Sequence, residues 1–276
     1  MTYNLRNPQS PISARGPWGR FLAMPNDSLP KTFGVAILVA LVSATAVSLT
    51  SISLRPYQQA HIDAAREAQF SAMIAALPGL DDILRETGAD TLTSVVVDLS
   101  RGVLDPGVDP AHFDFVVAQT DPALSIALPP EADLARIGRR PTHAPVYLLR
   151  DGPTLALAVL PIYGTGYQSI IRAYLALEGD LNTVAGLSIY EQGETPGLGA
   201  RVTDPQWQAQ WNARQIADDS GSIVIGVVRS GASGPHEVDA LTGATRSSNG
   251  VAAMVQFWMG PNGYGPFLDT LRQEAR

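Results

Sequence analysis

The chain has 276 residues, a net charge of −7 and no cysteine. This length is enough to bury a full-size core, and the acidic balance gives no basic footprint for nucleic acid. Without cysteine the chain can form no disulfide, thiolate zinc site or cysteine-held iron–sulfur cluster, so redox chemistry would need a bound organic cofactor. Four histidines lack metal-ligand spacing and are expected to be ordinary surface or core residues: His61, His112, His143 and His236.

An uncharged apolar run near the start of the chain predicts a transmembrane helix over residues 32–54. A helix of that length, rising about 1.5 Å per residue, spans a hydrocarbon core roughly 30 Å thick. A secretory signal peptide is the competing interpretation. Its apolar region is shorter, about 7–15 residues, and some thirty residues precede the run in this chain.

The charges before the apolar run predict its orientation. Four basic residues stand against the single acid Asp27, namely Arg6, Arg15, Arg20 and Lys31. By the positive-inside rule, we expect residues 1–31 to form a cytoplasmic tail and everything after Arg55 to lie in the periplasm.

Two further regions follow the predicted span. Residues 55–89 are expected to form a stalk helix and linker, because alanine and apolar residues recur at helical spacing. Residues 90–276 are expected to form one α+β domain with a largely antiparallel sheet and flanking helices. Short β-branched runs predict its strands, at 91–99, 146–149, 154–162, 182–190 and 222–228. Helix signals appear at Trp207–Trp211 and again after Ser247.

Two glycine-containing loops are candidates for ligand binding. In I-Y-G-T-G-Y, Gly164 and Gly166 either let the backbone approach a flat ligand or make a bulge, and spacing alone favours the bulge. In Y-E-Q-G-E-T-P-G-L-G-A-R, the glycines and proline force irregular backbone, and Glu194 and Thr195 offer hydrogen-bonding groups. A long turn is the alternative for this loop. The chain has no G-x-S-x-G, Walker or dinucleotide-binding motif.

The third candidate is D-A-L-T-G-A-T-R-S-S, at residues 239–248. Ser247 or Ser248 is expected to cap the helix that follows, which leaves the hydroxyls of Thr242 and Thr245. The amino terminus of a helix favours a phosphate, because its N–H groups are unpaired and its dipole end is positive. Arg246 could add charge. A phosphate esterified to a threonine hydroxyl would be well stabilised there.

The stretch D-A-L-T-G-A-T resembles the flavinylation motif, which is Asp, two free positions, Ser/Thr, Gly, Ala and Thr, with FMN joined to the last threonine through a phosphoester. Other segments extend the likeness: L-R-P-Y-Q, S-I-A-L-P, A-P-V-Y, E-T-P-G-L-G and F-W-M-G-P-N-G-Y-G-P-F-L. From about Lys31 to its end, the chain resembles the family of the C subunit of the sodium-translocating NADH:quinone oxidoreductase.

The resemblance implies the residues of a cofactor site. Thr245 would carry the FMN, with Asp239, Thr242, Gly243 and Ala244 as the rest of the motif. The E-T-P-G-L-G loop would form part of the flavin surroundings, together with the two glycines of the earlier loop; these residues are Glu194, Thr195, Gly197, Leu198, Gly164 and Gly166. No catalytic residue and no metal ligand are expected in this chain.

The resemblance also implies an electron relay in a multisubunit complex of the bacterial inner membrane. The flavin would accept an electron from a neighbouring metal centre and pass it to another subunit's covalent flavin, while sister subunits, including iron–sulfur ones, oxidise NADH and reduce quinone. A flavin transferase would attach the FMN. The protein itself would tune the flavin rather than supply an acid, base or nucleophile.

One departure from the family pattern and two alternative functions remain. Where the family usually reads Gly-Leu-Trp, this chain has Gly166-Tyr167-Gln168, so the packing of that loop is open. The G subunit of the related Rnf electron-transport complex shares the flavinylation and E-T-P-G motifs but is typically shorter. A membrane-anchored scaffold protein without cofactor is the other alternative, and the intact T-G-A-T argues against it.

Overall fold

A computed structural model describes residues 19, 21, 23–25, 28–50, 93–110 and 112–274. The chain divides into two compact units, Met1–Asp63 and Ala64–Arg276, and each is considered by itself. The predicted stalk at 55–89 and most of the predicted cytoplasmic tail lie outside the described residues.

The first unit contains one helix long and apolar enough to cross a membrane, Leu29–Thr50. The prediction of 32–54 overlaps this helix, and residues 51–54 lie outside the described part. Its large apolar side chains, such as Phe33 and Ile37, are exposed, unlike those of a core helix in a soluble protein. The hydroxyl of Thr45 donates to the carbonyl of Leu41 at 2.7 Å, which suits an apolar surrounding because the polar group is satisfied within the helix.

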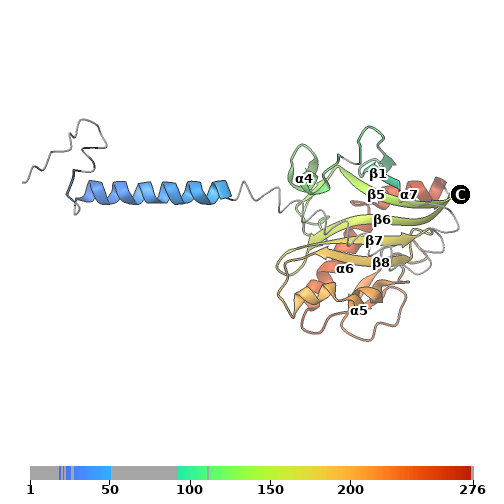
Figure 1. The fold of residues 1–276 in the computed structure, drawn as a ribbon. Coiled ribbons are helices and arrows are strands. Elements are labelled where there is room, and N and C mark those ends of the chain that lie inside the picture. The colour runs from blue at the N-terminus through green and yellow to red at the C-terminus, as the bar shows by residue number, and fades with distance from the viewer. Residues whose placement is uncertain are drawn as a thin grey trace, which may run out of the picture. The chain divides into compact units, whose positions relative to one another are not determined.

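A six-stranded antiparallel sheet forms the centre of the second unit, as Figure 1 shows. In the order of the sheet, the strands are β2 (Val103–Leu104), β1 (Thr93–Asp98), β5 (His143–Asp151), β6 (Thr154–Thr165), β7 (Ile170–Glu178) and β8 (Val184–Glu191). Two small pairs accompany it. The strands β3 (Ser125–Ala127) and β4 (Arg139–Pro141) pair antiparallel, whereas β9 (Gly226–Val228) and β10 (Glu237–Asp239) pair parallel. The predicted α+β class with a largely antiparallel sheet is confirmed.

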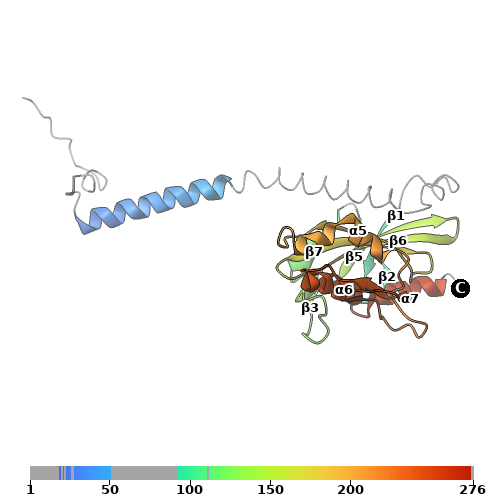
Figure 2. The same ribbon diagram turned by 90° about the horizontal axis from the view of Figure 1, so that it is seen from below.

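Helices lie around the sheet, and Figure 2 shows the two longest, α6 and α7, on one side of it. The elements are α4 (Phe115–Thr120), the 3-10 helix η1 (Gly199–Thr203), α5 (Pro205–Gln208), η2 (Ala209–Trp211), α6 (Thr245–Met259) and α7 (Gly265–Glu274). The helix signal around Trp207–Trp211 is confirmed by α5 and η2.

Apolar side chains fill both faces of the sheet. The main core lies between the sheet and α6 and α7, where Trp211, Trp258 and Phe267 are almost fully buried. A second cluster occupies the other face and comes from β5, β6 and β7: Leu149, Leu157, Val159, Tyr174 and Ala176. Strands buried on both faces lose the simple alternation of apolar and polar residues. This explains why β7, I-I-R-A-Y-L-A-L-E, does not stand out in the sequence.

Helix α6 approaches the end of β6 closely because glycines meet there. A Cβ at Gly250 would lie 2.9 Å from the Cα of Gly166 and 3.0 Å from the carbonyl oxygen of Thr165. A Cβ at Gly164 would lie 2.9 Å from the Cβ of Met254. Polar bonds fix the same contact, since the indole Nε1 of Trp258 donates to the carbonyl of Tyr163 at 2.7 Å. The helix is therefore held in a fixed position on the strand.

We predict that Gly250→Ala destabilises the protein by about 1–3 kcal/mol, because backbone atoms must move to admit the methyl group. Helix propensity alone would make the alanine variant more stable than the glycine parent. A loss of stability would therefore report the steric conflict and not the propensity. Gly226→Ala is the control, because its added Cβ meets no atom closer than 3.9 Å. Chemical denaturation followed by tryptophan fluorescence measures both variants. A Gly250→Ala protein as stable as the parent would contradict the close approach.

Candidate functional site

Helix α6 begins at Thr245, and its first turn is poorly satisfied. The N-cap residue Ala244 makes no side-chain hydrogen bond to the helix, and no acidic residue lies in the first turn. Gly243 before it has φ +81°, a left-handed conformation that glycine adopts readily. The side chains of Thr242, Thr245 and Arg246 are exposed. The helix therefore presents an exposed hydroxyl at a positively polarised end.

The predicted capping role of Ser247 or Ser248 is wrong, because the helix starts earlier than their positions allow. Both serines lie within α6 and are buried. The Ser248 hydroxyl accepts from the backbone N–H of Leu241 at 3.0 Å and donates to the carbonyl of Ala244 at 3.1 Å. The Ser247 hydroxyl donates to Glu194 at 2.6 Å. Both hydroxyls are thus occupied, and the two threonine hydroxyls are the accessible ones.

Glu194 is the centre of the site. Its side chain is buried, and its carboxylate accepts hydrogen bonds from two other segments of the chain. The backbone N–H groups of Tyr167, Gln168 and Ser169 donate to it at 3.0–3.2 Å, and the Ser169 hydroxyl donates at 3.0 Å. Ser247 supplies the remaining bond from α6. One carboxylate therefore joins the β6–β7 turn, its own loop and the first turn of α6.

This arrangement also sets the charge of Glu194. Burial tends to raise the pKa of the carboxyl, but the hydrogen bonds from Ser247, Gln168 and Ser169 outweigh it and hold the pKa below its ordinary value of 4.5. The group is therefore a carboxylate at neutral pH. Sequence reasoning identified Glu194 as part of the flavin surroundings, whereas its hydrogen bonds here are made to the protein.

Glycines let these segments meet. A Cβ at Gly199 would lie 2.5 Å from the Ser247 hydroxyl and 2.8 Å from Glu194 Oε2. A Cβ at Gly166 would lie 2.7 Å from Glu194 Oε1. The close approach expected at Gly164 and Gly166 is therefore made by α6 and Glu194, and it accounts for both glycines by packing within the protein.

The rest of the E-T-P-G-L-G loop faces solvent beside the motif. Gly197 has φ +74°, and a Cβ added there would meet no atom within 4 Å. The Leu198 side chain is 50% exposed and its Cδ2 would lie 3.6 Å from a Cβ on Gly243. The Thr195 hydroxyl donates to the side-chain oxygen of Gln168 at 3.0 Å. Leu198 therefore offers an apolar surface next to the T-G-A-T turn.

Asp239 anchors the start of the motif through hydrogen bonds to neighbouring segments. Its carboxylate accepts from the N–H of Ala232 at 2.8 Å, and its carbonyl accepts from the indole of Trp207 at 2.8 Å. Its N–H donates to the side chain of Gln210 at 3.1 Å. A cavity of about 200 Å³ lies beside this anchor and is lined by Thr242 together with Arg201, Asp204, Gln206, Trp207, Gln210, Ala240 and Leu241. Thr242 thus borders this cavity, while Thr245 begins the helix.

A cation–aromatic contact lies at the same place. The guanidinium carbon of Arg246 lies 5.0 Å from the centre of the Tyr167 ring, within the range of a cation–π interaction. Tyr167 is 52% exposed. Tyr167 lies in the loop where the sequence departs from Gly-Leu-Trp, Arg246 lies in α6, and no sequence pattern predicted their contact.

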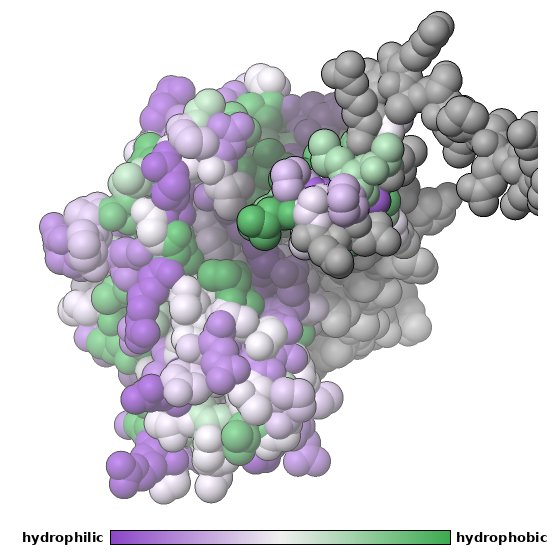
Figure 3. All heavy atoms as spheres, turned by 90° about the vertical axis from the view of Figure 1, so that its left-hand side faces the viewer, coloured by the Kyte–Doolittle hydropathy of each residue, from purple (hydrophilic) through white to green (hydrophobic). Residues whose placement is uncertain are grey.

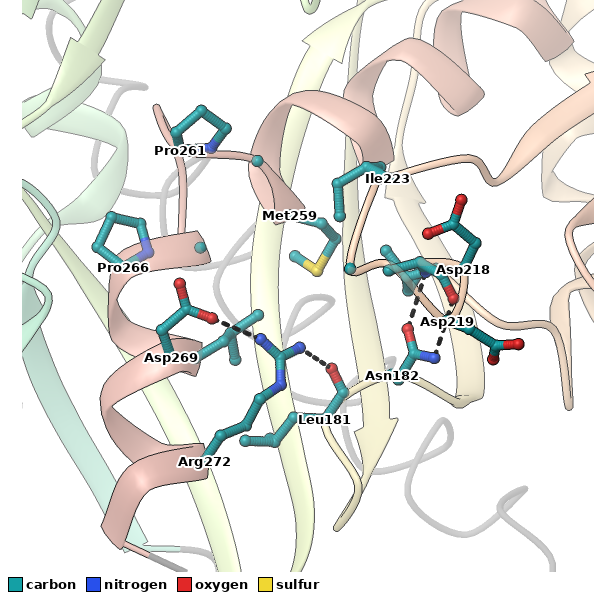
Figure 4. A pocket seen from close by; sticks show the side chains of 16 residues that line it. Leu181, Asn182, Asp218, Asp219, Ile223, Met259, Pro261, Pro266, Asp269 and Arg272 are labelled. Carbon is teal, nitrogen blue, oxygen red and sulfur yellow. Dashed lines mark hydrogen bonds and ion pairs between the residues drawn. The ribbon is translucent and has the colours of Figure 1, made fainter.

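The remaining surface offers a larger but separate cavity. It measures about 540 Å³, lies near the carboxyl end of α6 and contains none of the predicted site residues, as Figure 4 shows. Arg272 there pairs with Asp269 at 2.8 Å and donates to the carbonyl of Leu181 at 2.8 Å. Figure 3 shows a face on which hydrophobic residues stand at separate points around a hollow rather than as one patch.

The family model, the similar sequences and the similar solved structure all indicate the same family. Residues 166–260 match the family described as FMN-binding domain. The chain is 38% identical to the C subunit of the Na(+)-translocating NADH-quinone reductase from Yersinia pestis, over 91% of this chain and 96% of that protein. It is 38% identical to the Pseudomonas aeruginosa protein of the same name, over 90% of this chain and 97% of that protein. The crystal structure of NqrC from Shewanella oneidensis matches with a TM-score of 0.63 and 35% identity, over 70% of this chain and 88% of that one.

We predict that Glu194→Gln destabilises the folded protein by about 1.5–3 kcal/mol at pH 7, because an amide is uncharged and accepts at one oxygen only, whereas both carboxylate oxygens accept hydrogen bonds here. The pKa of Glu194 is lowered by folding, so its contribution is complete above the ordinary value and is lost as pH falls through the folded pKa. The difference between parent and variant should therefore shrink in acid.

Denaturant titrations from pH 7 to pH 3 measure this difference. Glu178→Gln is the control, because Glu178 lies exposed at the end of β7. If the difference in unfolding free energy between the parent and Glu194→Gln stays constant over the whole pH range, the carboxylate charge is not the stabilising feature.

Proposed function

The chain belongs to the family of the C subunit of the Na(+)-translocating NADH-quinone reductase, and from this we propose that it relays electrons through an FMN joined to Thr245 by a phosphoester. The match of residues 166–260 to the FMN-binding domain family supports the cofactor. The attachment at Thr245 rests on the motif D-A-L-T-G-A-T and on the geometry at the start of α6.

The observation that carries the proposal is the electrostatic imbalance at that helix start. The helix has no side-chain cap and no acid in its first turn, and it carries the cation Arg246 where a negative charge is favoured. Each of these features is unfavourable alone. A phosphodiester on Thr245 would compensate all three. Its oxygens can accept hydrogen bonds from the free N–H groups, and its negative charge would interact favourably with the helix dipole and with Arg246.

The accessibility of the hydroxyls selects Thr245 among its neighbours. Ser247 and Ser248 are buried and hydrogen-bonded, so neither can carry a bulky group without rebuilding the helix start. Thr242 and Thr245 are both exposed. Thr242 borders the small cavity that Arg201 also lines, and we assign it to recognition by the flavin transferase rather than to attachment.

Side chains near Thr245 could receive a flavin ring. Leu198 offers apolar surface beside Gly243, and Tyr167 offers an exposed aromatic face beside Arg246. We propose that the E-T-P-G-L-G loop forms one wall of the flavin site through Leu198. Glu194, Thr195, Gly164 and Gly166 shape that wall from beneath, and the positive φ of Gly197 gives the loop its turn.

We place the chain within a complex whose other subunits oxidise NADH and reduce quinone. The flavin supplies the electron-carrying chemistry, and this chain's residues hold it in place and exclude competing contacts. Its electron donor would be a neighbouring metal centre, and its acceptor a second covalent flavin. The relatives from Yersinia and Pseudomonas both carry the name of the C subunit, which favours this role over the G subunit of the Rnf complex.

We predict that Thr245→Ala abolishes covalent flavin and the electron transfer that depends on it, because no accessible hydroxyl remains at the helix start. Ser248→Ala should retain the flavin and cost about 1–3 kcal/mol of stability, since the N–H of Leu241 loses its buried acceptor. Thr242→Ala should lower the extent of attachment without moving it.

Peptide mass spectrometry of these variants and the parent, each produced together with the transferase, measures both the presence and the position of the FMN. Flavin found on Thr242, Ser247 or Ser248 of the parent would refute the assignment. A parent without any flavin in its native membrane would favour the scaffold alternative.

We predict that protease added to intact spheroplasts removes the second unit and spares residues 1–31, because the basic residues before Leu29–Thr50 favour a cytoplasmic amino terminus. A tag at each end of the chain reports the two outcomes by immunoblot. If the carboxyl-terminal tag is protected until the membrane is permeabilised, the predicted orientation is wrong.

A further inference from the structure

The face of the sheet that turns away from α6 and α7 is buried. It carries the second hydrophobic cluster, and we call it the second face: Leu149, Leu157, Val159, Tyr174 and Ala176. Val159 and Ala176 are 0% exposed, and Tyr174 is 8% exposed. Among the described residues, every hydrophobic side chain in this cluster or packed against it comes from β5, β6, β7 or β8. Side chains stand roughly perpendicular to a sheet, so their tips stay accessible unless a second layer covers them.

The described helices of the second unit contribute to the main core instead. Helices α6 and α7 lie on the other side of the sheet, as Figure 2 shows. The shorter helices also direct apolar side chains into the main core: Phe115 from α4, Val202 from η1, Trp207 from α5 and Trp211 from η2. The layer over the second face must then come from outside the described residues. In the second unit, which begins at Ala64, these are residues 64–92, 111, 275 and 276, and only the first stretch is long enough to form a layer.

The sequence of that stretch contains an apolar stripe at helical spacing. Large apolar side chains recur at positions i, i+3, i+4 and i+7, namely Phe70, Met73, Ile74 and Leu77. The opposite side of such a helix would carry Ala68, Ala72 and Ala75. Pro78 and Gly79 follow directly and are typical of a helix end.

The dimensions of the stripe and of the second face agree. From Phe70 to Leu77 a helix rises about 10 Å, at 1.5 Å per residue. The cluster comes from β5, β6 and β7, and with strands about 4.8 Å apart the outer two lie about 10 Å from each other. Two helical turns therefore suffice to cover the three strands.

We propose that residues 66–77 form a helix whose apolar stripe packs on the second face, against Leu149, Val159 and Tyr174. The fifteen residues from 78 to 92 then lead to β1, and at about 3.3 Å per residue they can span up to about 50 Å. Chain length therefore does not restrict the path. Because Thr93 pairs with Leu148, the chain re-enters the sheet beside the strand that carries Leu149.

This helix makes the sheet the middle of three layers, so part of the predicted stalk belongs to the folded second unit. Hydrophobic burial on both faces explains why the strands lack an alternating pattern. The proposal does not depend on the flavin, because it concerns the face opposite α6.

Single cysteines test the orientation of the segment, because the chain has none of its own. In the folded full chain in detergent, the thiols introduced by Met73→Cys and Ile74→Cys should react with N-ethylmaleimide at least tenfold more slowly than those introduced by Ala72→Cys and Ala75→Cys. All four should react alike in denaturant. Equal rates at the four positions of the folded chain overturn the proposal.

A matched pair on β7 tests where the segment packs. Ala173 and Ala176 are both 0% exposed, but Ala173 faces the main core and Ala176 lies on the second face. Combined with Met73→Asp, Ala176→Cys should gain at least tenfold in reactivity, whereas Ala173→Cys should stay protected. Ala72→Asp is the control and should leave both thiols protected.

If the thiol introduced by Ala176→Cys stays protected in the Met73→Asp background, the segment is not the cover, and a second copy or another protein occupies the second face. That result overturns the proposal. If Met73→Asp unfolds the second unit and makes both thiols reactive, the comparison of positions 72 to 75 decides alone.

Discussion

The carboxylate of Glu194 is the interaction on which the geometry around Thr245 depends. It joins its own glycine-rich loop to a turn between two strands and to the first turn of α6, through residues that lie 25 to 53 positions from Glu194 in the chain. Because the Ser247 hydroxyl is buried with it and the bonds from the β6–β7 turn are partly buried, removal of the carboxylate would leave several N–H and O–H groups unsatisfied at once. The position of the motif is thus determined by an ionised group whose hydrogen bonds run to the β6–β7 turn and to Ser247 rather than to the two exposed threonines.

The close packing beneath α6 complements this polar contact. Gly166, Gly199 and Gly250 each leave out a side chain where backbone or carboxylate atoms need the space. The helix start is consequently well positioned but electrostatically unsatisfied, since its cap is Ala244 and its first-turn charge is Arg246. Natural sequences tolerate such local conflicts mainly at functional sites, which agrees with a group attached there.

The sequence predicted the α+β class, most strands of the sheet and the membrane-type helix, because these depend on local patterns of apolar residues. It missed β7, whose alanines and arginine obscure a strand buried on both faces. It identified Glu194 and the glycine loops but not their mutual contact, because a hydrogen bond between Glu194 and Ser247 leaves no trace in spacing. The boundary of α6 was misplaced by the serines, which resemble caps but serve tertiary bonds.

The contacts that fix α6 on the sheet also bear on when a group could be attached to Thr245. The bonds from Trp258 to Tyr163 and from Tyr264 to Pro161 join residues 95 and 103 positions apart. Contacts of such long range form only after much of the chain has collapsed, since closing large loops costs entropy first. Thr245 therefore acquires its native surroundings late in folding. An enzyme that recognises those surroundings would act on a completed domain and leave misfolded chains unmodified, which would make attachment a check on folding.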